Sequence, residues 1–348
     1  MVMVVTPIQG ILTDRFGARR VVLVCIPLFV AGLAAMSLMP RNLIVFYLMW
    51  ASLPVLAIGL WPTAYLKSVG GWFDKRLGFA LGVANAGFGV GAMLVPLIAG
   101  SLIALYGWRT TFVCLAGLAL LTFPVALAFL RERPRAATDT AKGDLQGSAV
   151  RSIALGRLLR DSLFRKLGLG YVLIGFAGTG FAVNLVSMSI HNGASQKEAV
   201  TLQVIYGATA LFGRLFSGWL LDRLFAAWVM SVFVAGAAMA CGVFIAGATG
   251  LPAVAGAVFH GLLLGAEFDV LAYVVRRNYP MASFGKIYGI VFALFQAGAS
   301  IGAAFLATSA QRTGGYALGM TGYAIALALS LLFFLRLDPY RIGKFRHG

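Results

Sequence analysis

The stretch that decides the fold lies at residues 10–15 (GILTDR), and a close copy of it, GWLLDR, occupies residues 218–223. The two copies stand 208 residues apart in a chain of 348 residues. Further along, two glycines of the first half have counterparts at an offset of 207: Gly82 and Gly91 match Gly289 and Gly298. Two motifs repeated at nearly one offset indicate that the chain contains a duplicated unit.

The composition around these motifs excludes a soluble domain. Hydrophobic residues make up 60% of the chain and charged residues only 11%, against about 25% charged in an ordinary soluble domain. Long stretches without any charge recur, as at residues 167–196 and 287–311, and about 20 helical residues are enough to cross a hydrocarbon core. These runs are continuous rather than alternating, which excludes a β-barrel. The sequence therefore predicts an all-α, polytopic membrane protein.

The apolar runs predict ten full membrane spans and one partial span. The partial span covers residues 1–13, because 13 residues of helix rise only about 20 Å. The full spans are expected at residues 21–39, 43–66, 79–106, 112–130, 167–190, 199–221, 224–248, 252–275, 287–309 and 316–335.

The loop charges predict the orientation. When loops are assigned alternately to two sides, 23 of the 28 Lys and Arg residues fall on one side, four on the other, and Arg214 inside a span. The positive-inside bias makes the richer side cytoplasmic. The net charge of +17 is spread over short loops, so we expect the lipid bilayer as the partner and no nucleic acid. The predicted location is the cell membrane, specifically the bacterial inner membrane, which the chain would cross several times.

Residues 131–166 form the longest loop and divide the chain. Its second part, from residue 150, mixes apolar residues with arginines and predicts a basic amphipathic helix on the inner leaflet. The expected domains are an N-terminal bundle (1–130), this linker, a six-helix bundle (167–337) and a basic tail (338–348). Since the offset of 208 places the counterpart of the span at 167–190 before residue 1, we expect 6+6 bundles with about 11 of 12 spans present, the first missing and the second partial.

These features resemble the major facilitator superfamily. Its signature, Gly-x-Leu-x-Asp-Arg-x-Gly-x-Arg, is met by Gly10, Leu12, Asp14, Arg15, Gly17 and Arg19, and the second copy keeps Gly218, Leu220, Asp222 and Arg223. Residues 71–82, 106–109 and 212–218 resemble the monocarboxylate porter and oxalate/formate antiporter branch. The match spans essentially the whole chain. The resemblance implies a secondary transporter that works by alternating access between two bundles.

The signature residues are implied by this resemblance to form a gate. The loop would latch the two bundles together in the outward-open state. A carboxylate such as Asp14 can pair with a cation or cap a helix N-terminus, while the alternative is a plain charged loop end. The pair Gly87 and Gly91 offers a small-residue face, on which the bundles would either rock or pack statically.

Arg214 is the one basic residue inside a span. A central Arg is costly in a bilayer and normally faces the bundle interior or water. The resemblance implies that it meets a substrate carboxylate, for which its planar fork is suited. The alternatives are snorkelling to the cytoplasm and pairing with Asp222.

Glu267 and Asp269 lie in one span and are candidates for proton coupling, because intramembrane carboxylates often relay protons. They are two residues apart, roughly 200° around the helix, so they cannot share one cavity wall. His260 shares a face with Glu267, which favours Glu267 as the proton site. The alternative is a buried ion pair that fixes helix register.

Other polar residues inside spans are weaker candidates. Each could line a substrate cavity or hydrogen-bond across helices. Together with Arg214 and His260, the predicted substrate-binding set contains Asn85, Asn184 and Tyr206.

We therefore expect a transporter of a small organic anion, a monocarboxylate, coupled to protons and monomeric. One alternative is an exporter of drug-like compounds. Others are an integral membrane enzyme or a non-transporting sensor. No metal cluster, phosphate loop or cofactor motif appears in the sequence, so no cofactor and no catalytic residue is expected.

Overall fold

The computed structural model describes residues 2–131 and 153–341, except for the side chains at 92, 93, 96 and 97, and in these residues its regular secondary structure is all helical. The first half begins with α1 (Val2–Phe16) and α2 (Ala18–Ala35). It continues with α3 (Leu43–Leu56), α4 (Pro62–Trp72), α5 (Leu77–Leu120) and α6 (Thr122–Phe129). Short 3-10 turns follow α2 and α3, at Met36–Leu38 and Ile58–Leu60.

The second half contains six long helices behind a short one, α7 (Leu155–Arg160). The long helices are α8 (Ser162–His191), α9 (Gln196–Leu221), α10 (Ala226–Ile245), α11 (Gly250–Asn278), α12 (Phe284–Thr313) and α13 (Ala317–Leu335). A 3-10 turn, Met281–Ser283, joins α11 to α12.

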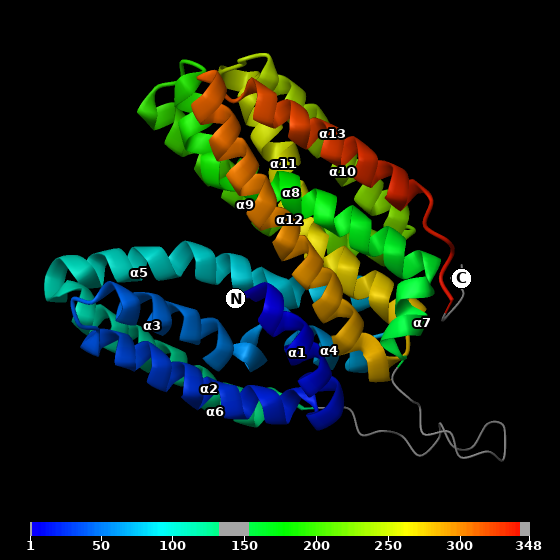
Figure 1. The fold of residues 1–348 in the computed structure, drawn as a ribbon. Helices are drawn as coiled ribbons and strands as arrows, with labels where there is room; N and C mark the ends of the chain where they lie inside the picture. Colours follow the sequence, from blue (N-terminus) through cyan, green and yellow to red (C-terminus); the bar gives the residue numbers. More distant parts are fainter. Residues whose placement is uncertain (1, 132–152, 342–348) are drawn as a thin grey trace.

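One predicted span is broken, and two others are continuous in the structure. The span at 43–66 is the pair α3 and α4, which is bent by 48° and contains Pro54. The spans at 79–106 and 112–130 are joined at Gly107, whose φ of 77° and ψ of 167° are not helical, and the chain turns back there (Figure 1). By length and hydropathy, the described residues hold eight helices able to cross a membrane, or nine with the bent pair. The first half of α5 contributes a shorter apolar helix, Leu77–Gly91, which accounts for the difference from ten.

The stretch predicted as one amphipathic helix, residues 150–166, is divided in the structure. α7 is only six residues long, and Asp161 then accepts a hydrogen bond from the Leu163 amide at 3.2 Å as the N-cap of α8. Residues 162–166 are therefore the first turn of α8. Residues 150–152 lie outside the described part of the chain.

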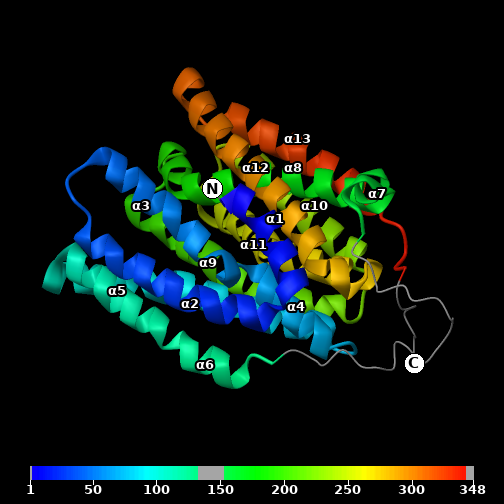
Figure 2. The same ribbon diagram turned by 60° about the horizontal axis from the view of Figure 1, so that its bottom comes forward.

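The helices form two bundles that meet at one end and diverge at the other. Figure 1 shows residues 2–129 (blue to teal) as one bundle and residues 162–335 (green to red) as the other. Helix α1 packs against α12, and α5 packs against α9; the turned view in Figure 2 shows α1 lying over α12. We call the end where the bundles meet the basic end, because the C-terminal segment and α7, which carries Arg157 and Arg160, lie there.

Paired glycines explain how the two bundles approach so closely. A Cβ added at Gly10 or Gly285 would lie within 2.5 Å of the other glycine's carbonyl oxygen, and the same holds for Gly78 and Gly218. Only glycine allows two helix backbones to touch in this way. Gly10 and Gly218 are 208 residues apart, and Gly78 and Gly285 are 207 apart. The two contacts are therefore equivalent under the repeat.

The contact between α5 and α9 loosens away from the basic end. A Cβ added at Gly82 would lie 2.4 Å from the Arg214 carbonyl oxygen, whereas one added at Gly87 or Gly91 would have no neighbour within 4 Å. The small-residue face predicted at Gly87 and Gly91 is thus not where the bundles touch in this conformation. The close approach lies one to two turns earlier, because that is where the bundles converge.

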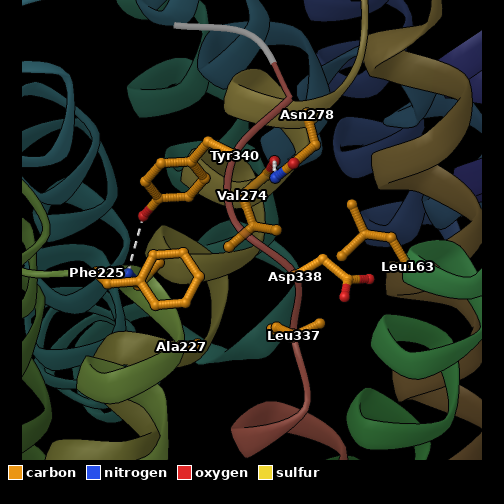
Figure 3. A pocket seen from close by; sticks show the side chains of 9 residues that line it. Leu163, Phe225, Ala227, Val274, Asn278, Leu337, Asp338 and Tyr340 are labelled. Atoms are coloured by element: carbon orange, nitrogen blue, oxygen red, sulfur yellow. Dashed lines mark hydrogen bonds between the residues drawn. The ribbon is translucent and has the colours of Figure 1, made fainter. Parts of the chain in front are cut away.

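The segment after α13, residues 336–341, crosses the basic end of the second bundle as a strap. The Tyr340 hydroxyl accepts a hydrogen bond from the Ala226 amide at 2.8 Å (Figure 3). Arg341 holds Asp161 through two hydrogen bonds of 2.7 and 2.8 Å. The strap therefore ties the start of α10 to the start of α8.

Candidate functional site

Asp14 joins the first bundle to the N-terminus of a helix in the second. Its Oδ1 accepts from the Gly285 amide at 3.0 Å, and its Oδ2 accepts from the Lys286 amide at 2.8 Å. These are amides of the first turn of α12, where the helix dipole favours a negative charge. Lys67 adds an ion pair to Asp14 at 2.6 Å.

Asp222 makes the mirror-image contact. Its two carboxylate oxygens accept from the Gly78 and Phe79 amides at 2.7 and 2.9 Å, at the first turn of α5. The second bundle thus caps a helix of the first, just as the first caps a helix of the second. The position equivalent to Lys67 is Val275, and among the described residues Asp222 forms no ion pair.

Three other residues of the first signature make contacts within the first bundle. The Arg15 guanidinium lies 5.3 Å from the Phe16 ring centroid. Gly17 adopts a φ of 88°, which glycine permits, and it is the turn between α1 and α2. Arg19 donates to the Leu127 carbonyl at 2.9 Å, which ties α2 to α6.

The arginine of the second copy also turns back on its own helix. Arg223 donates to the Trp219 carbonyl at 3.3 Å, and its guanidinium lies 3.9 Å from the centroid of that indole ring. The carboxylates Asp14 and Asp222 and the glycines Gly10 and Gly218 therefore join the bundles.

Two further arginines cross between the bundles at the basic end. Arg276 donates to the Gly70 carbonyl at 2.9 Å. Arg277 pairs with Asp74 at 2.9 Å, but the Asp74 side chain is 70% exposed. An exposed ion pair of this kind adds little stability. The two capping carboxylates and the Arg276 bond therefore contribute more to this contact than the exposed Arg277–Asp74 pair.

Arg214 lies in α9 at the seam with α5 and is only 4% exposed. Its guanidinium carbon lies 5.5 Å from the Phe88 ring centroid across the seam. Among the described residues, its Nη1 has no hydrogen-bond partner and no ion pair joins it to Asp222. A buried guanidinium with an unused donor can receive an anionic group.

Asp269 is the centre of a hydrogen-bonded chain that crosses the seam. Asn85 of α5 donates to its Oδ1, and Ser217 of α9 donates to its Oδ2 at 3.4 Å. The Tyr65 hydroxyl of α4 in turn donates to Oδ1 of the Asn85 side chain at 2.7 Å. Asp269 and Asn85 are both buried, so this chain links the two bundles in the membrane interior.

Glu267 points to a different neighbour from Asp269, as the spacing of two residues requires. A Cβ added at Gly178 of α8 would lie 4.0 Å from its Oε2, so the carboxylate faces the inside of the second bundle. In the described part of the chain, neither carboxylate oxygen has a hydrogen-bond partner. Only the backbone is engaged, since the Tyr171 hydroxyl donates to the Glu267 carbonyl at 2.6 Å.

His260 lies further along α11, stacked on Phe181 with ring centroids 3.8 Å apart. It is 1% exposed. Both of its ring nitrogens and the Tyr206 hydroxyl have no partner among the described residues. These atoms form a buried polar region between α8, α9 and α11, and among the described residues no hydrogen bond joins it to the Glu267 carboxylate.

Asn184 is the predicted site residue that the structure keeps apart. It donates to the Gly180 carbonyl of its own helix at 2.9 Å and is only half-buried. No hydrogen bond joins it to Arg214, Glu267 or Asp269. A side-chain amide that donates to the carbonyl four residues earlier is typical of a polar residue whose hydrogen bond is made within its own helix.

Sequence reasoning missed several members of this arrangement. Tyr65, Tyr171 and Ser217 carry hydroxyls that reach Asn85, Glu267 or Asp269, but an isolated hydroxyl in an apolar run has no distinctive pattern. Gly78 and Gly285 were detectable, because they repeat at the same offset of 207 as Gly82 and Gly289.

Comparisons with known proteins agree with the fold. The sequence matches the Major Facilitator Superfamily over residues 1–303 and again over residues 167–347. The chain is similar to the MFS transporter asaE of Aspergillus flavus, at 23% identity over 311 residues that cover 89% of this chain and 68% of that protein. Monocarboxylate transporter 11 of Mus musculus is 26% identical over 326 residues, 89% of this chain and 70% of that one.

Among solved structures, the fold is similar to that of FucP in the outward conformation. The TM-score is 0.72 at 18% identity, over 97% of this chain and 87% of the other. The predicted superfamily is confirmed by these matches. The chain therefore belongs to the Major Facilitator Superfamily, and it is a membrane transporter and not an enzyme.

Proposed function

We propose that this protein moves a small organic anion, a monocarboxylate, across the cell membrane by alternating access, driven by coupled protons. The observation that carries the proposal is Arg214, a guanidinium that is 4% exposed and has an unused donor at the seam between the bundles. A planar fork recognises a carboxylate through two parallel hydrogen bonds. Similarity to a protein named a monocarboxylate transporter supports the same substrate class.

The proposed cycle uses the contacts at the seam. In the present conformation, Asp14 and Asp222 hold the basic end closed by capping α12 and α5. Opening that end requires both caps to be released together, along with the bond between Asn85 and Asp269. A substrate that binds Arg214 between the bundles would shift this balance only through contacts that differ between the two states.

Glu267 is the proposed proton carrier. Neither of its carboxylate oxygens has a partner in the described residues, so gaining or losing a proton there would break no existing hydrogen bond. Asp269, in contrast, accepts from Asn85 and Ser217. Its proposed role is to join the bundles, and not to carry the coupled proton.

The substrate role is tested by Arg214→Lys in proteoliposomes with a panel of labelled monocarboxylates. The variant keeps the charge and loses the fork, so uptake should fall at least tenfold while the protein still inserts. Arg312→Lys, at an exposed position at the end of α12, is the matched control and should transport normally. Uptake of hydrophobic cations and no carboxylates would favour the exporter alternative, and no flux of either class would favour a sensor.

The proton role is tested by Glu267→Gln and Asp269→Asn. Glu267→Gln should abolish accumulation driven by a proton gradient and keep exchange of labelled for unlabelled substrate, since exchange moves no net proton. Asp269→Asn should slow both processes, because it weakens the link between the bundles. If both variants keep full accumulation at every pH, the coupling proposal for these carboxylates fails.

A further inference from the structure

A second site lies at the basic end, away from the seam. A pocket with a volume of about 400 Å³ opens between α7, the turn from α11 to α12, and the strap of residues 336–341. Arg157 and Arg160 line it from α7, and Arg341 lines it from the strap. None of Arg214, Glu267 and Asp269 borders it, so it is separate from the proposed transport site.

The lining of this pocket carries an excess of positive charge. Asp161 is the one carboxylate in it, and it is already engaged by Arg341 through two hydrogen bonds and by the Tyr279 hydroxyl at 2.6 Å. In the described parts of the chain, Arg157 and Arg160 form no ion pair. Two guanidinium groups therefore remain uncompensated at the mouth of one pocket.

The remaining wall is apolar and firmly held. Leu158 is 1% exposed and Tyr279 is 2% exposed, and Pro280 lies beside them in the lining. The strap is fixed by the Arg341 amide, which donates to the Asn278 side-chain carbonyl at 3.1 Å. A rigid pocket with an apolar floor and a basic rim suits an anion attached to an apolar body.

One residue of the lining, Ile153, is tied to the start of α12. Its amide donates to the Ser283 hydroxyl and its carbonyl accepts from the Lys286 ammonium, both at 2.9 Å. The amide of the same Lys286 is held by Asp14. The pocket lining is therefore linked through Ile153 to the segment that the first bundle caps, while Ser283 and Lys286 themselves do not line the pocket.

We propose that this pocket binds a phosphate-bearing anion at the basic end, supplied either by the headgroup of an anionic lipid or by soluble phosphate. The two uncompensated arginines match the charge of a phosphate, and guanidinium forks match its oxygens. Through Ile153, which lines the pocket and accepts a hydrogen bond from Lys286, the bound anion stabilises the conformation in which the basic end is closed.

The test uses the full-length protein, purified in detergent and titrated in separate arms with phosphatidylglycerol, phosphatidylcholine and inorganic phosphate. Melting temperature and lipid retained in native mass spectrometry are the two measurements. Phosphatidylglycerol should bind and raise the melting temperature, while phosphatidylcholine should not. Arg157→Gln and Arg160→Gln should each weaken binding about fivefold, as expected for a cation near an anionic surface.

Arg165→Gln is the matched control, because Arg165 is exposed at the same end and does not line the pocket. It should leave binding unchanged. A response to inorganic phosphate alone that is lost in Arg157→Gln and Arg160→Gln would assign the site to a soluble phosphate. Equal weakening by all three variants would reduce the effect to general surface charge and overturn the site, as would the absence of binding in every arm.

Discussion

The two bundles share their contacts and differ in their chemistry. At the offset of 208, Thr6 of α1 occupies the place of Arg214 in α9, and the carbonyl oxygen of each faces a glycine of the opposite bundle. At the same offset, the positions equivalent to Glu267 and Asp269 are occupied by Gly59 and Trp61. The repeat therefore preserves the scaffold that closes the basic end, while the buried charges of the seam belong to the second bundle alone among the described residues.

The packing of the bundles differs in the same direction. Helices α3 and α6 of the first bundle contain no buried residue, whereas the second bundle buries Tyr171, Phe181, Tyr288 and Tyr323 completely. Burial excludes water and strengthens the interaction of any charge held inside. Under the proposed function, the better-packed second bundle would therefore contribute most of the interaction with the substrate charge.

The largest expected difference between equivalent positions is at Arg214 and Thr6. Arg214→Met should lose about 2–5 kcal/mol of substrate binding, as when one partner of a buried charge pair is truncated. Thr6→Val should leave binding unchanged, because the Thr6 hydroxyl is buried without a partner in the described residues and valine keeps its shape. Substrate titration of both variants decides this, and an equal loss would show that both bundles recognise the substrate.

The next effect should be equal in the two bundles. A Cβ at Gly82 would lie 2.4 Å from the Arg214 carbonyl, and one at Gly289 would lie 2.5 Å from the Thr6 carbonyl. Overpacking of this kind costs about 1–3 kcal/mol, so Gly82→Ala and Gly289→Ala should both lower the melting temperature and expose the basic end to thiol labelling. Gly87→Ala, with open space at its Cβ, is the control, and destabilisation there would contradict the packing.

A smaller effect should separate the two capping carboxylates. Asp14→Asn and Asp222→Asn each weaken a charge-assisted cap worth about 1 kcal/mol, but Asp14→Asn also leaves the Lys67 ammonium without its partner. Asp14→Asn should therefore open the basic end more. In a Lys67→Met background the two substitutions should become equal, which a double-mutant cycle measures; a persistent difference would place its cause elsewhere.

The smallest effect concerns the strap, which the described residues of the first bundle lack. Burial alone would raise the pKa of Asp161, but hydrogen bonds from Arg341 and Tyr279 outweigh it and hold that pKa below its usual value. A lowered folded pKa stabilises above the unfolded pKa, about 4, and the gain is lost as pH falls through the folded value. The melting temperatures of wild type and Asp161→Asn should therefore differ at neutral pH and converge in acid; parallel curves would exclude this contact.

Much of the fold was predictable because hydropathy and repetition are local signals. The reversal at Gly107 falls between two spans that the apolar runs predict separately. The break within the span at residues 43–66 was not predicted, although Pro54 lies in it. The amides that bind Asp14 and Asp222 were not predictable, because a carboxylate that caps its own helix and one that caps a helix of the other bundle look alike in sequence. The bond between Asn85 and Asp269 was not predictable either, because it joins positions that are 184 residues apart.

The capping contacts also bear on how the sequence can drift. The donors that hold Asp14 and Asp222 are peptide amides at residues 285, 286, 78 and 79. Every amino acid except proline supplies such an amide, so most substitutions at Phe79 or Lys286 leave the donor in place. Half of each contact is therefore insensitive to mutation, and selection needs to maintain only the carboxylate and the glycines that bring it within reach.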